Sequence, residues 1–115
     1  MKKQFADKLP EGWDEFAEFF SALGDSTRQK ILLLFEAGEE ICVNEIASAF
    51  PLSRPAISHH LKVLRNADLL RSEKRGKEIY YRVNYDHCAK VLGLVHEFTV
   101  EQMKPENRLV NNAQV

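Results

Sequence analysis

The feature that most constrains this chain is a pair of short helix signals with a break of only a few residues between them. A first helix over residues 44–50 must stop before Pro51, because proline lacks an amide hydrogen and its ring clashes with the preceding turn. Ser53 belongs to the residue types preferred at a helix N-cap, so a second helix is predicted over residues 54–66. Two helices joined by so tight a turn predict a helix-turn-helix over residues 44–66.

The second of these helices has two contrasting faces. Apolar side chains recur at helical spacing, at Ile57, Leu61 and Leu64, and they predict a buried face. When a helix-turn-helix binds DNA, its second helix enters the major groove. We therefore expect DNA contacts from the N-cap residue and the other faces of this helix: Ser53, Arg54, Ser58, His59, Lys62 and Arg65. For His59 the alternative is a polar side chain that simply faces solvent.

A β-hairpin with a basic tip follows directly. Strands are predicted over residues 71–74 and 78–83, and Gly76 lies in the turn between them. A helix-turn-helix followed at once by such a hairpin is a winged helix, with the wing over residues 70–83. The wing cations are expected to neutralise DNA phosphates: Lys74, Arg75 and Lys77. His60 is expected to pack toward this wing.

The distribution of charge supports a nucleic-acid partner, although the total does not. The chain of 115 residues has a formal net charge of −1, which taken alone argues against binding a polyanion. Residues 53–82, however, hold 8 basic and 3 acidic side chains, a net charge of +5. Residues 1–52 hold 5 basic and 10 acidic side chains, and residues 83–115 hold 3 and 4. The basic segment coincides with the predicted second helix and wing, so it is the expected DNA-facing surface.

The helices at the two ends of the fold carry apolar stripes suited to dimerisation. An amphipathic helix is predicted over residues 12–22, and another over residues 85–103. Between two copies we expect these side chains to be buried: Trp13, Phe16, Phe20, Val91, Val95 and Phe98. A further helix is predicted from a cap at Asp25 as far as Gly38.

The predicted architecture is mainly α with a small β-hairpin, in the order α-α-α-α-β-β-α, and it is homodimeric. Residues 1–115 are taken as a single winged-helix domain, with a short β-like piece at residues 41–43 and a disordered tail over residues 105–115.

Three stretches resemble the ArsR/SmtB family of bacterial winged-helix repressors. They are ALGDSTRQKILLLF (22–35), LSRPAISHHLKVLRNADLL (52–70) and RGKEIYYRV (75–83), and the similarity extends over roughly residues 13–100. The resemblance implies a homodimer in which the first and last helices pair across the two-fold axis. It also implies an operator with imperfect two-fold symmetry, and repression that lasts until an inducer, often a metal ion, releases the protein.

Only part of each metal-ligand set known from the family is present in this chain, so the resemblance supports a divalent metal inducer only in part. Family members that sense soft metals often carry Cys-x-Cys in the third helix, where this chain has Cys42-Val43-Asn44. Other members bind zinc through a D-x-H pair and an H-x-x-H/E pair on the last helix. The matching residues here are Tyr85 and His87, then Phe98 and Glu101. His87 and Glu101 would lie about 21 Å apart along one helix, so they could share an ion only across a dimer.

Other inducers stay open. Some family relatives sense oxidants or sulfur species through a cysteine pair, so a thiol switch using Cys42 and Cys88 is one alternative. The plain reading of Cys42 is a small buried apolar residue beside Ile41. A different ligand, or no inducer at all, is the remaining possibility.

Several classes of protein are excluded. No run of 18 apolar residues could cross a membrane, and the first 16 residues lack the apolar stretch of a signal peptide, so a cytoplasmic protein is expected. Two cysteines are too few for a disulfide scaffold. The sequence has no glycine-rich phosphate loop, H-E-x-x-H motif or nucleophile elbow, so an enzyme is not expected. A winged helix that binds a protein instead of DNA is the alternative function.

Overall fold

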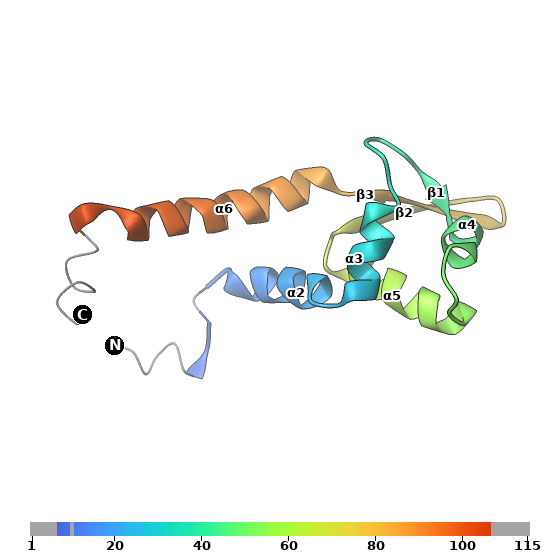
Figure 1. Cartoon of the computed structure of the whole chain (residues 1–115), viewed down its shortest axis with the longest axis horizontal. Coiled ribbons are helices and arrows are strands. Elements are labelled where there is room, and N and C mark those ends of the chain that lie inside the picture. Colours follow the sequence, from blue (N-terminus) through green and yellow to red (C-terminus); the bar gives the residue numbers. More distant parts are fainter. Residues whose placement is uncertain (1–6, 10, 107–115) are drawn as a thin grey trace. The chain divides into compact units, whose positions relative to one another are not determined.

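The computed structural model describes residues 7–9 and 11–106. It divides into two compact units, residues 1–85 and 86–115, and each is described by itself. The helices and strands follow in the order α2 (Trp13–Leu23), α3 (Ser26–Leu33), β1 (Ile41–Cys42), α4 (Val43–Ser48), α5 (Arg54–Asn66), β2 (Leu70–Arg75), β3 (Glu78–Val83) and α6 (Tyr85–Met103) (Figure 1).

The helix-turn-helix is formed by α4 and α5. The predicted start and end of α5 are confirmed, and the Ser53 hydroxyl oxygen accepts a hydrogen bond of 3.2 Å from the Ala56 backbone N–H. This bond satisfies one of the amide hydrogens that every helix leaves unpaired in its first turn. α4 ends at Ser48, two residues before the predicted limit.

The wing is part of a three-stranded antiparallel sheet with the strand order β1-β3-β2. Strands β2 and β3 form the predicted hairpin, in which Leu70 lies opposite Val83 and Arg75 opposite Glu78. Gly76 has a φ of 62° in the turn, a left-handed conformation that glycine adopts without the penalty of a Cβ atom. The predicted order of elements lacked the third strand, because β1 is two residues long and pairs with β3 far along the chain.

Helix α5 lies at the centre of the first unit. It contacts α2, α3, α4 and β2. Its apolar face is confirmed, since Ile57, Leu61 and Leu64 have no exposed surface. Other fully buried side chains in this unit are Phe19, Ile31, Ile46, Leu69 and Leu70. The core therefore holds α5 by one face and leaves its opposite face to solvent.

The helices around this core differ from their predicted limits in simple ways. α2 begins one residue later than predicted, after Gly12, whose φ is 88°. α3 is capped as predicted, since the Asp25 carboxylate accepts a hydrogen bond of 3.0 Å from the Arg28 backbone N–H. The prediction that α3 runs to Gly38 is wrong, because the helix ends at Leu33.

The second unit consists chiefly of α6. Several of its large apolar side chains are exposed: Leu92, Leu94, Phe98, Val100 and Met103. Within the described ranges, no helix is both long and apolar enough to cross a bilayer. The tail over residues 105–115, for which disorder is predicted, lies outside the described residues apart from its first two.

Candidate nucleic-acid interface

The exposed face of α5 carries the side chains that the sequence assigned to DNA. Arg54, Ser58 and Lys62 are spaced four residues apart, so they follow one another along one side of the helix. His59 and Arg65 are also exposed. Because the buried face of α5 is fixed in the core, these polar side chains project from a rigid support, as groove recognition requires.

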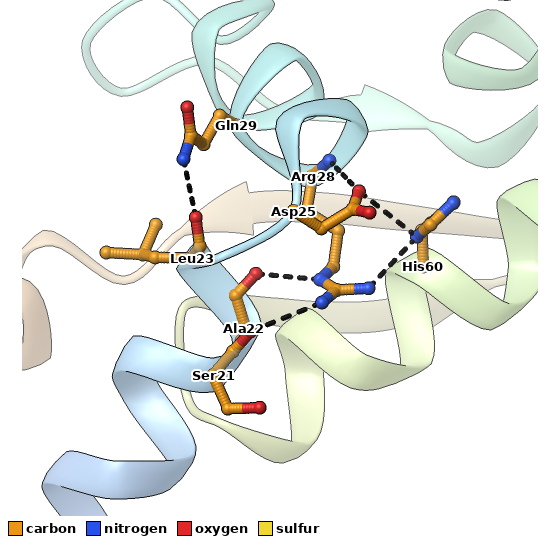
Figure 2. A network of polar contacts seen from close by, with 7 residues as sticks. All are labelled: Ser21, Ala22, Leu23, Asp25, Arg28, Gln29 and His60. Carbon is orange, nitrogen blue, oxygen red and sulfur yellow. Dashed lines mark hydrogen bonds and ion pairs between the residues drawn. The ribbon is translucent and has the colours of Figure 1, made fainter.

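His60 does not pack toward the wing, and that prediction is wrong. Its ring is partly buried and turns toward the corner between α2 and α3, where its Nδ1 lies 3.3 Å from Arg28 Nη1 and 3.9 Å from Asp25 Oδ2 (Figure 2). A guanidinium nitrogen can only donate, so a hydrogen bond in this contact requires Nδ1 to be the acceptor. His60 follows Ile57 by three residues and therefore borders the buried face of α5.

Arg28 is the centre of this polar network. Its Nε donates to the Ala22 carbonyl oxygen at 2.7 Å, and its Nη2 donates to the Ser21 carbonyl oxygen at 3.2 Å (Figure 2). These carbonyls lie in the last turn of α2, where helical partners run out. The same side chain contacts His60 on α5. Arg28 thus connects the end of α2 to α5, the proposed DNA-recognition helix. The sequence did not predict this role, although the residue lies within the stretch that resembles the family.

The start of α3 adds to the same network. The hydrogen bond from the Arg28 backbone N–H, with the nearby charge of Arg28, lowers the pKa of the Asp25 carboxyl below its ordinary value. Gln29 Nε2 donates to the Leu23 carbonyl oxygen at 2.6 Å. The corner between α2 and α3 is therefore satisfied by side chains of α3, and α5 is positioned against it.

The wing cations fall into two groups. Lys74 and Lys77 are exposed, and neither has an ion-pair partner in the part of the chain that the structure describes. The Arg75 guanidinium pairs with the carboxylates of Glu40 and Glu73. It also lies over the ring of Tyr80, 4.8 Å from the ring centroid. The three cations thus do not offer the same charge to a phosphate.

Comparison with known proteins identifies the family of this chain. Residues 25–72 match the family described as bacterial regulatory protein, arsR family. This match begins at the Asp25 cap and includes the whole helix-turn-helix. The chain is also 42% identical over 65 residues to the transcriptional repressor SdpR of Bacillus subtilis, covering 56% of this chain and 71% of the relative. The chain belongs to the ArsR family.

Solved structures of other ArsR-family proteins share this fold. An ArsR-like transcriptional regulator from Rhodococcus sp. RHA1 is 31% identical, with a TM-score of 0.73, over 89% of this chain and 92% of the other. A possible ArsR-family regulator from Mycobacterium bovis is described as a homodimeric winged helix-turn-helix DNA-binding domain. It is 26% identical, with a TM-score of 0.61, over 83% of this chain and 91% of the other. The present protein is accordingly an ArsR-family DNA-binding transcriptional repressor and not an enzyme.

The residues predicted for the ArsR-type dimer interface lie on α2 and α6. On α2, Trp13 and Phe16 are partly buried with ring centroids 5.5 Å apart, and Phe20 is exposed. On α6, Val91 is buried, Val95 is partly buried and Phe98 is exposed. Both helices therefore carry exposed and half-buried apolar side chains, whereas Val91 is already buried within one copy.

The predicted sensor residues of this ArsR-family chain lie on two elements, Cys42 on β1 and the other three on α6. Cys42 is buried on β1, with its Sγ 3.7 Å from Glu45 Oε1. Cys88 is half-buried on α6, and burial raises the pKa of its thiol, which disfavours the reactive thiolate. His87 and Glu101 lie on the same helix, too far apart along it to share an ion within one chain. Across the described residues, no three His, Cys, Asp or Glu side chains gather into a metal site.

Proposed function

We propose that this protein binds, as a homodimer, an operator with imperfect two-fold symmetry, and that it represses transcription there until an inducer releases it. The observation that carries the proposal is the division of α5 into a fully buried apolar face and an exposed basic one. In a two-fold dimer this basic face is presented twice, so two half-sites are contacted. A bacterial repressor acts in the cytoplasm, which is where we place the chain.

Each contact has a proposed role. Arg54 and Ser58 read base edges in the major groove, because arginine can bind guanine in a bidentate manner and serine can bond either bases or phosphates. His59 contacts a phosphate or a base edge beside them. The remaining contacts neutralise phosphates or position the helix on the backbone: Ser53, Lys62, Arg65, Lys74 and Lys77.

The test is the affinity for a short inverted-repeat duplex, measured by fluorescence anisotropy at increasing salt. Several phosphate contacts require that log K fall steeply with log salt. Lys62→Ala should reduce this slope by about 1.8, since each protomer loses one phosphate contact, and weaken binding to all sequences alike. Arg54→Ala should relax the preference at one base pair by about 1–3 kcal/mol. A salt-independent affinity, or one equal to that for unrelated DNA, would contradict the proposal.

The dimer is proposed to form through α2 and α6. The Mycobacterium bovis relative described as homodimeric supports this, as do the exposed apolar residues of α6. Sedimentation equilibrium should show a dimer for the native chain. A monomer is expected for the variant Leu92→Glu, because Leu92 is exposed and apolar on α6. A native chain that stays monomeric at micromolar concentration would overturn this part of the proposal.

The candidate sensor residues are Cys42, Cys88, His87 and Glu101, and a different ligand or no inducer at all is the alternative. Operator affinity should therefore be compared with the thiols reduced, with the thiols oxidised and with Zn²⁺ added. A fall on oxidation alone identifies a thiol switch, and a fall with Zn²⁺ alone identifies a metal switch. Unchanged affinity in all three conditions would remove these residues from the sensor.

A further inference from the structure

Arg75 ends β2 at the basic tip of the wing, where a phosphate contact is expected, yet its side chain is already occupied. Its guanidinium bonds the carboxylate of Glu40, in the segment before β1, and lies 2.9 Å from Glu73 Oε2 on β2. It also lies over the Tyr80 ring on β3. These four residues, the Arg75 cluster, come from three separate pieces of backbone.

The strand register explains why the cluster forms. Glu73 and Arg75 are two residues apart on β2, so their side chains share one face of the sheet. Tyr80 is the cross-strand partner of Glu73, and it therefore lies on this face beside them. Lys74 points to the opposite face, opposite Ile79 on β3. The arrangement thus follows from the pairing of β2 with β3 and from the position of Glu40 just before β1.

The charges of the cluster disfavour a phosphate. Arg75 and its two carboxylate partners together carry a net charge of −1. The pKa of the Glu73 carboxyl is lowered, chiefly by its hydrogen bond from Arg75, so this carboxylate stays ionised at neutral pH. A phosphate that approached Arg75 would have to displace one carboxylate and remain close to both. Among residues 7–9 and 11–106, Lys74 and Lys77 have no such carboxylate partners.

We propose that Arg75 is a positioning residue of the wing, which holds the β2–β3 hairpin against the segment before β1 through Glu40, while Lys74 and Lys77 make the phosphate contacts of the tip. This inference rests on the proposed DNA-binding function. In the native chain the hairpin is ordered before DNA arrives, so binding does not incur the cost of ordering it.

Salt dependence separates this role from a phosphate contact. Lys77→Ala should reduce the slope of log K against log salt by about 1.8, because each protomer of the dimer loses one phosphate contact. Arg75→Ala should leave the slope unchanged and weaken affinity by about two- to fivefold at every salt concentration, the size expected for an exposed ion-pair network. An equal loss of slope in Arg75→Ala and Lys77→Ala would overturn the inference, and so would an unchanged affinity in Arg75→Ala.

Arg75→Lys is the matched control, because it keeps the charge but loses the planar fork that two carboxylates and a ring can hold. We expect it to lose affinity as Arg75→Ala does, and to increase backbone motion at residues 74–78 in NMR relaxation. Native affinity in Arg75→Lys, together with a lost slope in Arg75→Ala, would identify a phosphate contact instead.

Glu40→Gln tests the connection to the segment before β1. Its affinity loss should not add to that of Arg75→Ala in the double variant, because both changes break the same contact. Additive losses would contradict a shared role. Circular dichroism of every variant establishes that it is folded. If the native chain itself shows no salt-dependent affinity, the proposed function fails, whereas a normal native slope with an altered slope in Arg75→Ala refutes only the inference about Arg75.

Discussion

The recognition helix and the wing lie in the same compact unit, but different forces hold them. α5 is fixed by a fully buried apolar face and by its contacts with α2, α3, α4 and β2. Leu70 and Tyr81 bury the base of the wing, but every residue of β2 after Leu70 is exposed, so the tip depends on strand pairing and on the Arg75 cluster. The comparison teaches that substitutions behind α5 should change stability, whereas substitutions in the wing should change DNA affinity in a protein that remains folded.

The largest effect is expected from Leu61→Ala, which removes a side chain with no exposed surface from the core side of α5. Loss of burial and the resulting cavity should lower the free energy of unfolding by about 2–5 kcal/mol. Urea denaturation measures the change. The control is Leu52→Ala, since Leu52 is 42% exposed and should lose much less. Equal losses would mean that the α5 core is not the main support of this region.

The next effect concerns Arg28, which joins α2 to α5. Arg28→Ala removes donors to the Ser21 and Ala22 carbonyls and to His60, so unfolding should become easier by about 1–3 kcal/mol. The adjacent Gln29→Ala removes one exposed hydrogen bond and serves as the control. Thermal denaturation of the two variants measures the difference. A loss in Arg28→Ala no greater than in Gln29→Ala would show that the network does not stabilise the fold.

A smaller effect is expected at the start of α5. Ser53→Ala removes the N-cap hydrogen bond to Ala56 and should cost about 1 kcal/mol of stability. Ser58→Ala lies on the exposed face of the same helix, so it should reduce DNA affinity and leave stability within about 0.5 kcal/mol. Because Ser53 is also a proposed DNA contact, the change in stability is the measurement that distinguishes the two serines. Equal losses of stability in Ser53→Ala and Ser58→Ala would contradict the view that Ser53 stabilises α5 whereas Ser58 only contacts DNA.

The smallest expected effects are on the stability of the protein at low pH. One carboxyl at the start of α3 and one in the wing contribute to it. The pKa values of Asp25 and Glu73 are both lowered, the first chiefly by the Arg28 backbone N–H and the second by the Arg75 side chain. A carboxyl whose pKa is lower in the folded state contributes stability above its unfolded pKa and loses it as pH falls through the folded one. In the variants Asp25→Asn and Glu73→Gln, which lack the carboxyl, stability should therefore fall less steeply below about pH 4 than it does in the native chain. Denaturation midpoints between pH 2 and 6 check this, and profiles parallel to that of the native chain would contradict it.

Local signals in the sequence predicted the recognition helix well. Ser53 and the apolar spacing of Ile57, Leu61 and Leu64 act within a few residues, and the start, end and buried face of α5 agree with them. The contacts that were missed join residues far apart in the chain. His60 turns to Arg28, which is 32 residues away, and Arg75 turns to Glu40, which is 35 residues away. Helical periodicity shows that a residue borders a buried face, but it does not say which neighbour lies there.

The wing illustrates the same limit. From the sequence, the three cations at the tip of the wing are equivalent, because composition and spacing assign the same charge to Lys74, Arg75 and Lys77. Only the register of β2 and β3 shows that Arg75 shares a face with Glu73 and Tyr80. The short β-like piece predicted at residues 41–43 is β1, but its pairing with β3 was not predicted, since two residues carry too little pattern to identify a partner strand.

The pairing of β1 with β3 also sets an order of events for the folding chain. Ile41 lies opposite Tyr81, so this contact closes a loop that contains all of α4 and α5. Closing so long a loop costs chain entropy that short-range contacts do not, and long-range pairing of this kind is slow. The helix-turn-helix can therefore collapse early from local contacts, and the sheet is completed after it. During synthesis of the chain, α5 is therefore expected to form before the wing that supplies the remaining DNA contacts.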